Sequence, residues 1–284
     1  MIIATFQHPC PFFDDSYAVN SQNCGPYGDA LMTELIPYIE EHFRVIQKPY
    51  ARVLSGGSTG GWESLALQIF HPDFFGGTWS FYPDPVDFRY YCLTNIYEDQ
   101  NAFSKDFGWL KLERPVMRNP HGQVLVTMRQ MEAVLGSHGR SGQQLDIWQA
   151  AYGPVGEDGY PKPLWDKQTG EIDPKVAEYF KKHFDLRTYL EKNWSWLGPK
   201  LVGKIHVYCG DMDHFYLNEA VYELEKFLEN TQNPYYAGSF HYGRPRKGHG
   251  WNPFGYSTGK LQREMAETIQ KNASDEENTR MWNY

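Results

Sequence analysis

Short apolar segments alternate with amphipathic segments along the chain. Apolar runs rich in β-branched or aromatic residues predict strands at 2–6, 51–55, 76–83, 204–210 and 235–243. Apolar residues at helical spacing predict helices at 29–43, 63–70, 219–230 and 259–272. Strands that alternate with helices indicate an α/β fold, in which a mostly parallel sheet carries helices on both faces.

One long segment interrupts this alternation. About 120 residues separate the strand predicted at 76–83 from the strand predicted at 204–210. Three stretches in between have a helical pattern and are joined by links rich in Gly and Pro, namely 124–136, 142–153 and 174–194. We therefore expect a single domain of residues 1–284. Its parts are a core of 1–96 and 201–271, a largely helical, cap-like insertion at 97–200 and a polar tail at 272–284.

Composition limits the classes of partner. The 284 residues carry a net charge of −8, and Lys and Arg form no clustered block, which argues against nucleic acid as the main partner. No apolar run approaches the roughly 20 residues that a membrane helix needs, and the N-terminus lacks the basic and apolar regions of a signal peptide. The compartment and the oligomeric state are not determined by these features.

The four cysteines carry no metal-binding or redox motif. They are Cys10, Cys24, Cys92 and Cys209, and none forms a C-x-x-C pair. A disulfide between Cys10 and Cys24 is compatible with the sequence but cannot be derived from spacing.

The sequence predicts no metal site. Four histidines that could act as ligands match no helix-borne zinc pattern in their spacing, namely His8, His214, His241 and His249. Asp211, Asp213 and Asn218 loosely resemble a calcium loop, but Tyr216 stands where an EF-hand has glycine.

A Gly-rich turn, SGGSTGGW at 55–62, lies between a predicted strand and a predicted helix. Gly56, Ser58 and Gly60 fit the G-x-S-x-G pattern of a nucleophile elbow, in which small residues let the chain turn tightly around an exposed serine. The N–H of Thr59 would then face a developing oxyanion, aided by the positive end of the helix.

Two phosphate-binding motifs are excluded at this turn. A P-loop requires a lysine directly after its glycines, and the nearest downstream lysine is Lys105. The glycine spacing also fails to match a dinucleotide-binding fingerprint. A close-packed turn without chemistry is the remaining alternative.

Candidate partners for Ser58 occur in the chain order that this fold requires, which is Ser, then Asp or Glu, then His. Asp211 and Asp213 follow an apolar strand, and His249 lies in a Gly-flanked loop before the last helix. An Asp at such a place is also a common cap, and a loop His is often only a surface residue. Asp84, after the third strand, is a further candidate acid. Asp87 and Arg89 are expected to form an ion pair or a substrate clamp.

With these residues in place, the chain resembles the esterase branch of the α/β-hydrolases, which includes esterase D, enterochelin esterase, feruloyl esterases and the antigen 85 mycolyltransferases. The resemblance is carried by IIATF, ELIPYIEEHFRV, RVLSGGSTGGWESL, VYCGDMD and RKGHGW. It implies an α/β-hydrolase-like sheet, with the insertion placed before the acid-bearing strand.

The resemblance also implies roles for individual residues. Ser58 is the expected nucleophile and His249, in a G-H-x-[WF]-like loop, the expected base. Asp213 is the expected acid because members place it in a G-x-x-D, and Asp211 is held in reserve. Such a triad cleaves a small-molecule carboxylic ester through an acyl-enzyme that water resolves, without metal or organic cofactor. The same triad supports acyl transfer to another alcohol.

The chain departs from the family pattern at its start. Relatives carry strands before the one that IIATF resembles, and one of them ends in an H-G loop that supplies the second oxyanion donor. Two interpretations follow: the chain is the C-terminal part of a longer protein, or the sheet is trimmed and a loop such as Gln7 to Phe13 supplies the donor. A non-catalytic or weakly active binding module is therefore the alternative function.

Overall fold

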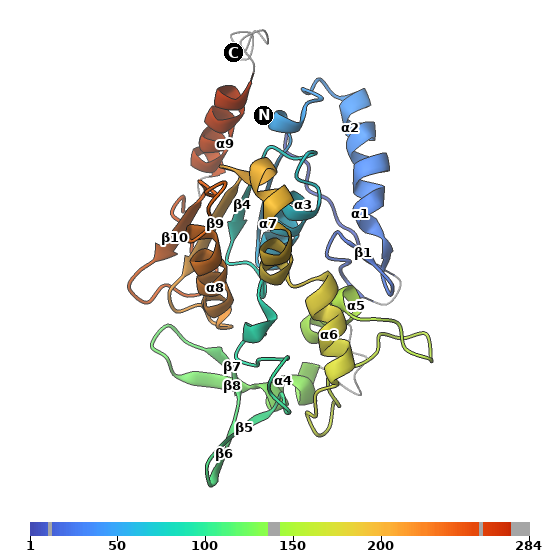
Figure 1. The fold of residues 1–284 in the computed structure, drawn as a ribbon, viewed down its shortest axis with the longest axis vertical. Coiled ribbons are helices and arrows are strands. Elements are labelled where there is room, and N and C mark those ends of the chain that lie inside the picture. Colours follow the sequence, from blue (N-terminus) through green and yellow to red (C-terminus); the bar gives the residue numbers. More distant parts are fainter. Residues whose placement is uncertain (11–12, 136–142, 256–257, 274–284) are drawn as a thin grey trace.

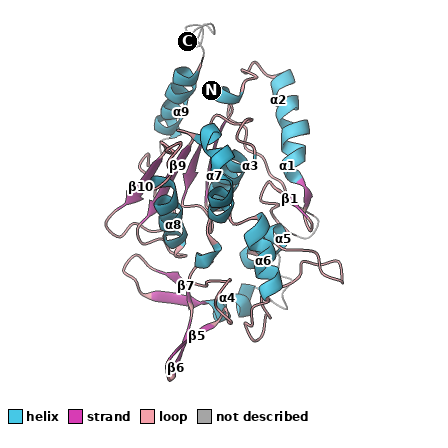
Figure 2. Cartoon of the chain, viewed as in Figure 1, coloured by secondary structure: helices cyan, strands magenta, loops and turns pink. Residues whose placement is uncertain are grey.

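A four-stranded parallel sheet forms the centre of the molecule (Figures 1 and 2). The computed structural model describes residues 1–10, 13–135, 143–255 and 258–273. The strands lie in the order β10-β9-β4-β3, with bounds Ser239–Gly243, Ile205–Gly210, Gly77–Phe81 and Val53–Gly57. Four of the five predicted strands thus exist, and their carboxyl ends meet at one edge of the sheet.

The alternation of side chains on β4 shows how both faces of the sheet are covered. Trp79 and Phe81 point to the face covered by α9 (Thr258–Asn272), where Trp79 Nε1 donates to Glu264 Oε1 at 2.8 Å. Ser80 points to the opposite face and donates to the Gly61 carbonyl at 2.7 Å. All five residues of β4 are buried, as a parallel strand between two helical layers requires.

Three helices cover the second face. They are α3 (Thr59–Phe70), α7 (Leu186–Leu201) and α8 (Leu217–Glu229). Helix α3 packs on β3 and β4, α8 packs on β9, and α7 packs against both of these helices. Residues 61–69 of α3 are all buried, so this helix has protein on every side. With helices on both faces, the fold class predicted from the sequence is confirmed.

The long segment before β9 contains the predicted helices and two unpredicted hairpins. The helices are α4 (Met128–Leu135), α5 (Gln144–Tyr152), α6 (Pro174–His183) and α7. The hairpin strands are β5 (Ser104–Phe107), β6 (Leu110–Glu113), β7 (Pro115–Arg118) and β8 (Val124–Thr127). The helix expected over 124–136 therefore starts only at Met128, because its β-branched beginning pairs with β7.

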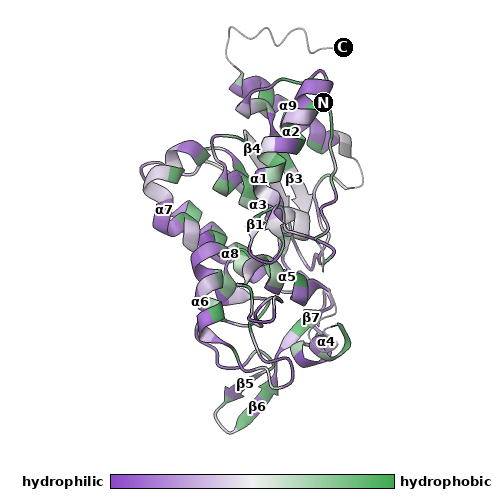
Figure 3. Cartoon of the chain, turned by 90° about the vertical axis from the view of Figure 1, so that its right-hand side faces the viewer, coloured by the Kyte–Doolittle hydropathy of each residue, from purple (hydrophilic) through white to green (hydrophobic). Residues whose placement is uncertain are grey.

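The helices of this segment share one apolar core with α3. Trp148 and Tyr152 of α5 and Phe180 of α6 belong to the same buried cluster as Trp62. The β5–β6 hairpin instead projects from the body and carries exposed apolar residues (Figures 1 and 3), including Trp109 at its turn. The domain limits at 96 and 201 remain a prediction.

The strand predicted at 2–6 is wrong. Residues 1–9 have no regular structure, and the side chains of Met1, Ile2 and Ile3 are exposed. A β-branched run becomes a strand only where a neighbour pairs with it and covers a face. Among the described residues β3 pairs only with β4 and forms one edge of the sheet.

The remaining elements are short or lie outside the sheet. The helix expected over 29–43 is a continuous rod in three parts, α1 (Tyr27–Ala30), a π-helical turn η1 (Leu31–Leu35) and α2 (Ile36–His42). The short elements are β1 (Asn20–Ser21), β2 (Gly25–Pro26), η2 (Pro49–Ala51) and η3 (Phe88–Tyr90). Most of the predicted polar tail, 274–284, lies outside the described residues. Within the described ranges, no helix combines the length and apolar character needed to cross a bilayer.

Candidate active site

Ser58 occupies a strained turn between β3 and α3. Its φ of 57° and ψ of −118° lie in a region that non-glycine residues rarely adopt. The Ser58 N–H donates to the Phe81 carbonyl at 3.0 Å, which ties the turn to the end of β4. A Cβ on Gly56 would lie 2.2 Å from the Gly60 carbonyl oxygen, so this turn closes only with glycine at 56. These features are those of a nucleophile elbow.

Asp213 and His249 meet at the same edge of the sheet. Asp213, which follows β9, is fully buried, and its Oδ2 lies 2.8 Å from His249 Nδ1. Its other oxygen, Oδ1, accepts from the N–H groups of Phe215 at 2.8 Å and Leu217 at 3.3 Å. The carboxylate is therefore fixed in rotation by the start of α8, with one oxygen left for the imidazole.

Two aromatic rings hold the imidazole of His249. The ring of Tyr82 lies 4.7 Å from it and the ring of Phe215 lies 5.2 Å from it, both in edge-to-face contact. This loop, which follows β10, packs closely, because a Cβ on Gly248 would lie 2.3 Å from His214 Nε2.

Asp211 supports the loop that carries His249. Its two carboxylate oxygens accept from the N–H groups of Arg246 at 3.2 Å and Lys247 at 2.9 Å. Both oxygens of Asp211 therefore accept hydrogen bonds from the backbone just before His249. The preference for Asp213 as the partner of His249 agrees with this geometry.

The Ser58 hydroxyl points to a different carboxylate. Ser58 Oγ donates to Asp84 Oδ1 at 3.3 Å, and Thr59 Oγ1 donates to Asp84 Oδ2 at 3.2 Å. Within the ranges that the structure describes, no hydrogen bond joins Ser58 to His249. The candidate residues at this edge of the sheet therefore form two groups, with Ser58 beside Asp84 and His249 beside Asp213.

Tyr82 lies between these two groups. Besides its contact with His249, its hydroxyl closely approaches β3, since a Cβ on Gly57 would lie 2.5 Å from the Tyr82 oxygen. The φ of Tyr82 is 34°, so this residue, like Ser58, departs from ordinary backbone conformation directly after a strand.

Three side chains around Asp84 were not predicted from the sequence. The Tyr17 hydroxyl and Trp148 Nε1 donate to Asp84 Oδ2, the latter at 3.1 Å, and Gln144 Nε2 donates to it at 3.2 Å. Gln144 and Trp148 are four residues apart on α5 and so share a helix face, which a periodicity search could have found. Nothing in the sequence near Tyr17 indicates its place here.

Burial raises the pKa of the Asp84 carboxyl, although its hydrogen bonds to Tyr17 and Trp148 oppose this shift. The folded protein therefore holds this proton more tightly than the unfolded chain does. The contribution of Asp84 to stability is greatest below the ordinary pKa of 3.8 and is lost as the pH rises above it towards the folded pKa.

Asp84→Asn is expected to remove this part of the pH dependence, because the amide does not titrate. Relative to the native chain, the free energy of unfolding of Asp84→Asn should increase as the pH rises above the ordinary carboxyl pKa of 3.8. Urea unfolding at several pH values measures this difference. Asp106→Asn, at an exposed position, is the control. Parallel curves for the native chain and Asp84→Asn would contradict the expectation.

One candidate oxyanion donor lies at the elbow. The Thr59 N–H belongs to the first turn of α3, where helix geometry leaves N–H groups without intrahelical acceptors. The proposed second donor in the segment Gln7 to Phe13 falls partly on residues 11 and 12, which lie outside the described residues.

Other candidate residues have structural partners. Arg89 forms an ion pair with Asp87 at 2.5 Å and with Glu223 at 2.9 Å, in line with the first of the two interpretations of this motif. Asn218, one of the residues that loosely resemble a calcium loop, accepts at Oδ1 from Arg118 at 2.9 Å. All four cysteines are free, buried thiols, so Cys10 and Cys24 form no disulfide.

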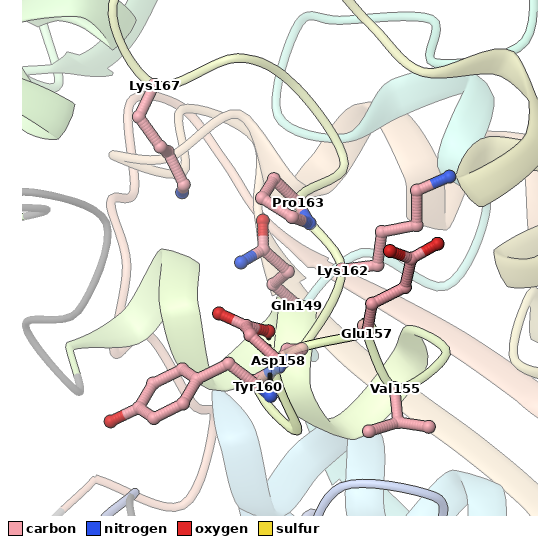
Figure 4. A pocket seen from close by; sticks show the side chains of 10 residues that line it. Gln149, Val155, Glu157, Asp158, Tyr160, Lys162, Pro163 and Lys167 are labelled. Carbon is pink, nitrogen blue, oxygen red and sulfur yellow. Dashed lines mark hydrogen bonds between the residues drawn. The ribbon is translucent and has the colours of Figure 1, made fainter.

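A cavity of about 540 Å³ lies beside the segment 155–163 and α5. Figure 4 shows Gln149 and Lys167 among the side chains around it. Neither Ser58 nor His249 is among its lining residues. This cavity is therefore separate from the candidate catalytic residues.

A parallel sheet whose strand ends carry a serine elbow, a buried carboxylate and a histidine is the arrangement of the α/β-hydrolases. The family described as "Putative esterase" matches residues 11–266, and the chain belongs to this family. No curated protein matches the chain significantly.

Several solved structures are similar in fold. A ferulic acid esterase is 16% identical, with a TM-score of 0.46, and the match covers 90% of this chain and 65% of that one. An S-formylglutathione hydrolase from Agrobacterium tumefaciens is 12% identical, with a TM-score of 0.43 and coverages of 90% and 64%. FphF, a fluorophosphonate-binding serine hydrolase of Staphylococcus aureus, is 14% identical, with a TM-score of 0.41 and coverages of 89% and 68%. The chain thus spans about two thirds of the length of these proteins.

Proposed function

We propose that this chain hydrolyses small-molecule carboxylic esters, with Ser58 as nucleophile, His249 as base and Asp213 as the acid that orients the base. The observation that carries the proposal is the strained Ser58 at the end of β3, at the same sheet edge as the 2.8 Å contact between Asp213 and His249. Membership of the esterase family supports the same reaction class.

The geometry of each group supports its proposed role. The Asp213 carboxylate holds the proton of His249 on Nδ1, which leaves the Nε2 lone pair to accept the Ser58 proton as Oγ attacks the ester carbonyl. The tetrahedral intermediate then collapses, His249 gives the proton to the leaving alcohol, and an acyl-enzyme remains on Ser58. Water attacks this acyl group in the second half, with His249 again as base.

The Ser58 hydroxyl must first leave Asp84. In the resting structure it donates to that carboxylate, and attack requires rotation about the Cα–Cβ bond to bring the hydroxyl towards His249. Catalytic hydrogen bonds often form only in the substrate complex, so the resting geometry is compatible with the proposal. The Thr59 N–H would stabilise the oxyanion that forms next to this position.

Covalent labelling tests the nucleophile directly. A fluorophosphonate probe should label the folded chain once, at Ser58, and peptide mass spectrometry should locate the adduct. Ser58→Ala should not react. Ser55→Ala, at a serine three residues earlier in β3, is the matched control and should react as the native chain does. Folded native protein that takes up no probe would refute the proposal.

The bond between Ser58 and Asp84 favours one alternative, a module that binds its ligand without cleaving it. In that case Ser58 is a structural donor to Asp84, and the probe fails to react while the protein stays folded. If labelling succeeds, product analysis with an added alcohol as acceptor distinguishes hydrolysis from acyl transfer, because both reactions share the acyl-enzyme.

A further inference from the structure

His8, Asp15 and Glu63 form a compact cluster outside the triad. One ligand atom from each lies within 4.8 Å of the other two. Asp15 is two residues before Tyr17, and Glu63 lies on the first turns of α3, five residues after Ser58. The cluster therefore joins the N-terminal part of the chain to the helix that follows the elbow.

The hydrogen bonds of His8 leave one ring nitrogen directed at a carboxylate. His8 Nδ1 lies 2.9 Å from Ser16 Oγ and 3.6 Å from Asp15 Oδ1, so the ring proton is best placed on this nitrogen. Nε2 then carries a lone pair, and it lies 3.5 Å from Glu63 Oε1. Two acceptors that face each other in this way need a proton or a cation between them.

Glu63 Oε1 faces the cluster. Only 9% of Glu63 is exposed, and within the described residues no hydrogen bond reaches its buried Oε1. Asp15 adds a second carboxyl group to the cluster, and its Oδ1 also accepts from the Tyr17 N–H at 2.6 Å. The cluster thus brings one imidazole and two carboxyl groups within reach of a single ion.

From this geometry we infer that His8, Asp15 and Glu63 bind a zinc ion. One imidazole and two carboxylates are ligands that zinc accepts, and oxygen-only sites would favour magnesium or calcium instead. Ligands at about 2.0–2.2 Å from a tetrahedral ion lie roughly 3.4 Å apart, close to the separation of Nε2 and Oε1. The contact from Ser16 to Nδ1 supplies the outer hydrogen bond that orients a metal-bound histidine.

The cluster is accessible to an ion. His8 also lines a groove of about 460 Å³ together with Phe6, Tyr27 and Leu31. Water entering by this groove would fill the fourth coordination position, which three protein ligands leave open.

The ion would have a structural role next to the elbow. Asp15 Oδ1 accepts from the Tyr17 N–H at 2.6 Å, and the Tyr17 hydroxyl bonds Asp84 beside Ser58. Zinc would hold Asp15 against α3 and would thereby fix the position of Tyr17. This proposal departs from the sequence-based expectation of no metal, and it is independent of whether the triad is active.

Metal binding to the full chain tests the proposal. Protein freed of metal by chelation is dialysed against Zn²⁺, and bound metal is measured by inductively coupled plasma mass spectrometry. We expect one ion per chain with a dissociation constant of about 10 μM or lower. Glu63→Gln and His8→Gln should each weaken binding by about tenfold or more. Asp14→Asn removes the same charge from the exposed neighbour of Asp15 and should bind as the native chain does.

Two further readouts keep the test independent of variant folding. Co²⁺ bound to the native chain should give visible absorption bands that one equivalent of Zn²⁺ abolishes. Zn²⁺ should also raise the melting temperature of the native chain and of Asp14→Asn alike. The inference would be overturned if the native protein bound no zinc at about 10 μM. The contact between His8 and Glu63 would then be an ordinary ion pair. Equal zinc affinity in folded Glu63→Gln and the native chain would overturn it as well.

Discussion

Asp213→Asn is expected to lower kcat for hydrolysis of an aryl ester by about 10⁴. Asp213 Oδ1 accepts two backbone N–H groups, from Phe215 and Leu217, so the single oxygen of asparagine must stay there. The amide NH₂ then replaces Oδ2 opposite His249 Nδ1. A donor at this place forces the imidazole to carry its proton on Nε2, where it can no longer accept the proton of Ser58.

Asp211→Asn is the matched control, with the same change two residues away. Asp211 contacts the N–H groups of Arg246 and Lys247, and an amide keeps one of these two acceptors. The loss of the other is expected to change kcat by no more than about tenfold. Steady-state kinetics of both variants, with circular dichroism to verify folding, distinguish the two acids. A larger loss in Asp211→Asn than in Asp213→Asn would reverse their assignment.

Gly56→Ala is expected to destabilise the protein by about 3 kcal/mol, whereas Gly60→Ala is expected to stay within about 1 kcal/mol of the native chain. A Cβ at position 56 would lie 2.2 Å from the Gly60 carbonyl oxygen and 2.7 Å from the Gly60 Cα. Both are backbone atoms of the elbow, so the turn itself would have to open. A Cβ at position 60 meets nothing within 4 Å, and the residue already lies in α3.

Chemical denaturation of the two variants measures this difference. Because the opened turn would also move Ser58, Gly56→Ala should lose fluorophosphonate labelling, and Gly60→Ala should keep it. Equal stability of the two variants would show that the elbow adapts to a side chain at position 56.

Local pattern determined much of the fold. The strands β3, β4, β9 and β10 were predicted because buried parallel strands are short apolar runs. The helices α3, α8 and α9 were predicted from apolar residues at helical spacing. The edge of the sheet that holds the site followed from topology, because carboxyl ends of parallel strands meet at one edge. Ser58, the two acids Asp211 and Asp213, and His249 were candidates because each lies directly after, or in the loop after, a recognisable strand. The resemblance to the esterase branch then favoured Asp213 over Asp211.

Context decided the elements that were wrong or missing. The run at 2–6 has strand composition, but no strand in the described part of the chain pairs with it, and Ile2 and Ile3 remain exposed. Val124 to Thr127 form a hairpin strand because β7 pairs with them. Four residues are too few for their hydrophobic periodicity to distinguish a strand from the first turn of a helix.

The sequence by itself determined the α/β class, the elbow with its glycines, and the order of the candidate triad, because these depend on neighbours within a few residues along the chain. Only the tertiary structure decided that Ser58 rests on Asp84, that Tyr17, Gln144 and Trp148 surround this carboxylate, and that Gly56 rather than Gly60 is sterically required. It also brought His8 and Asp15 to Glu63. Contacts between segments tens of residues apart depend on how helices and loops pack over the sheet, and no spacing along the chain encodes them.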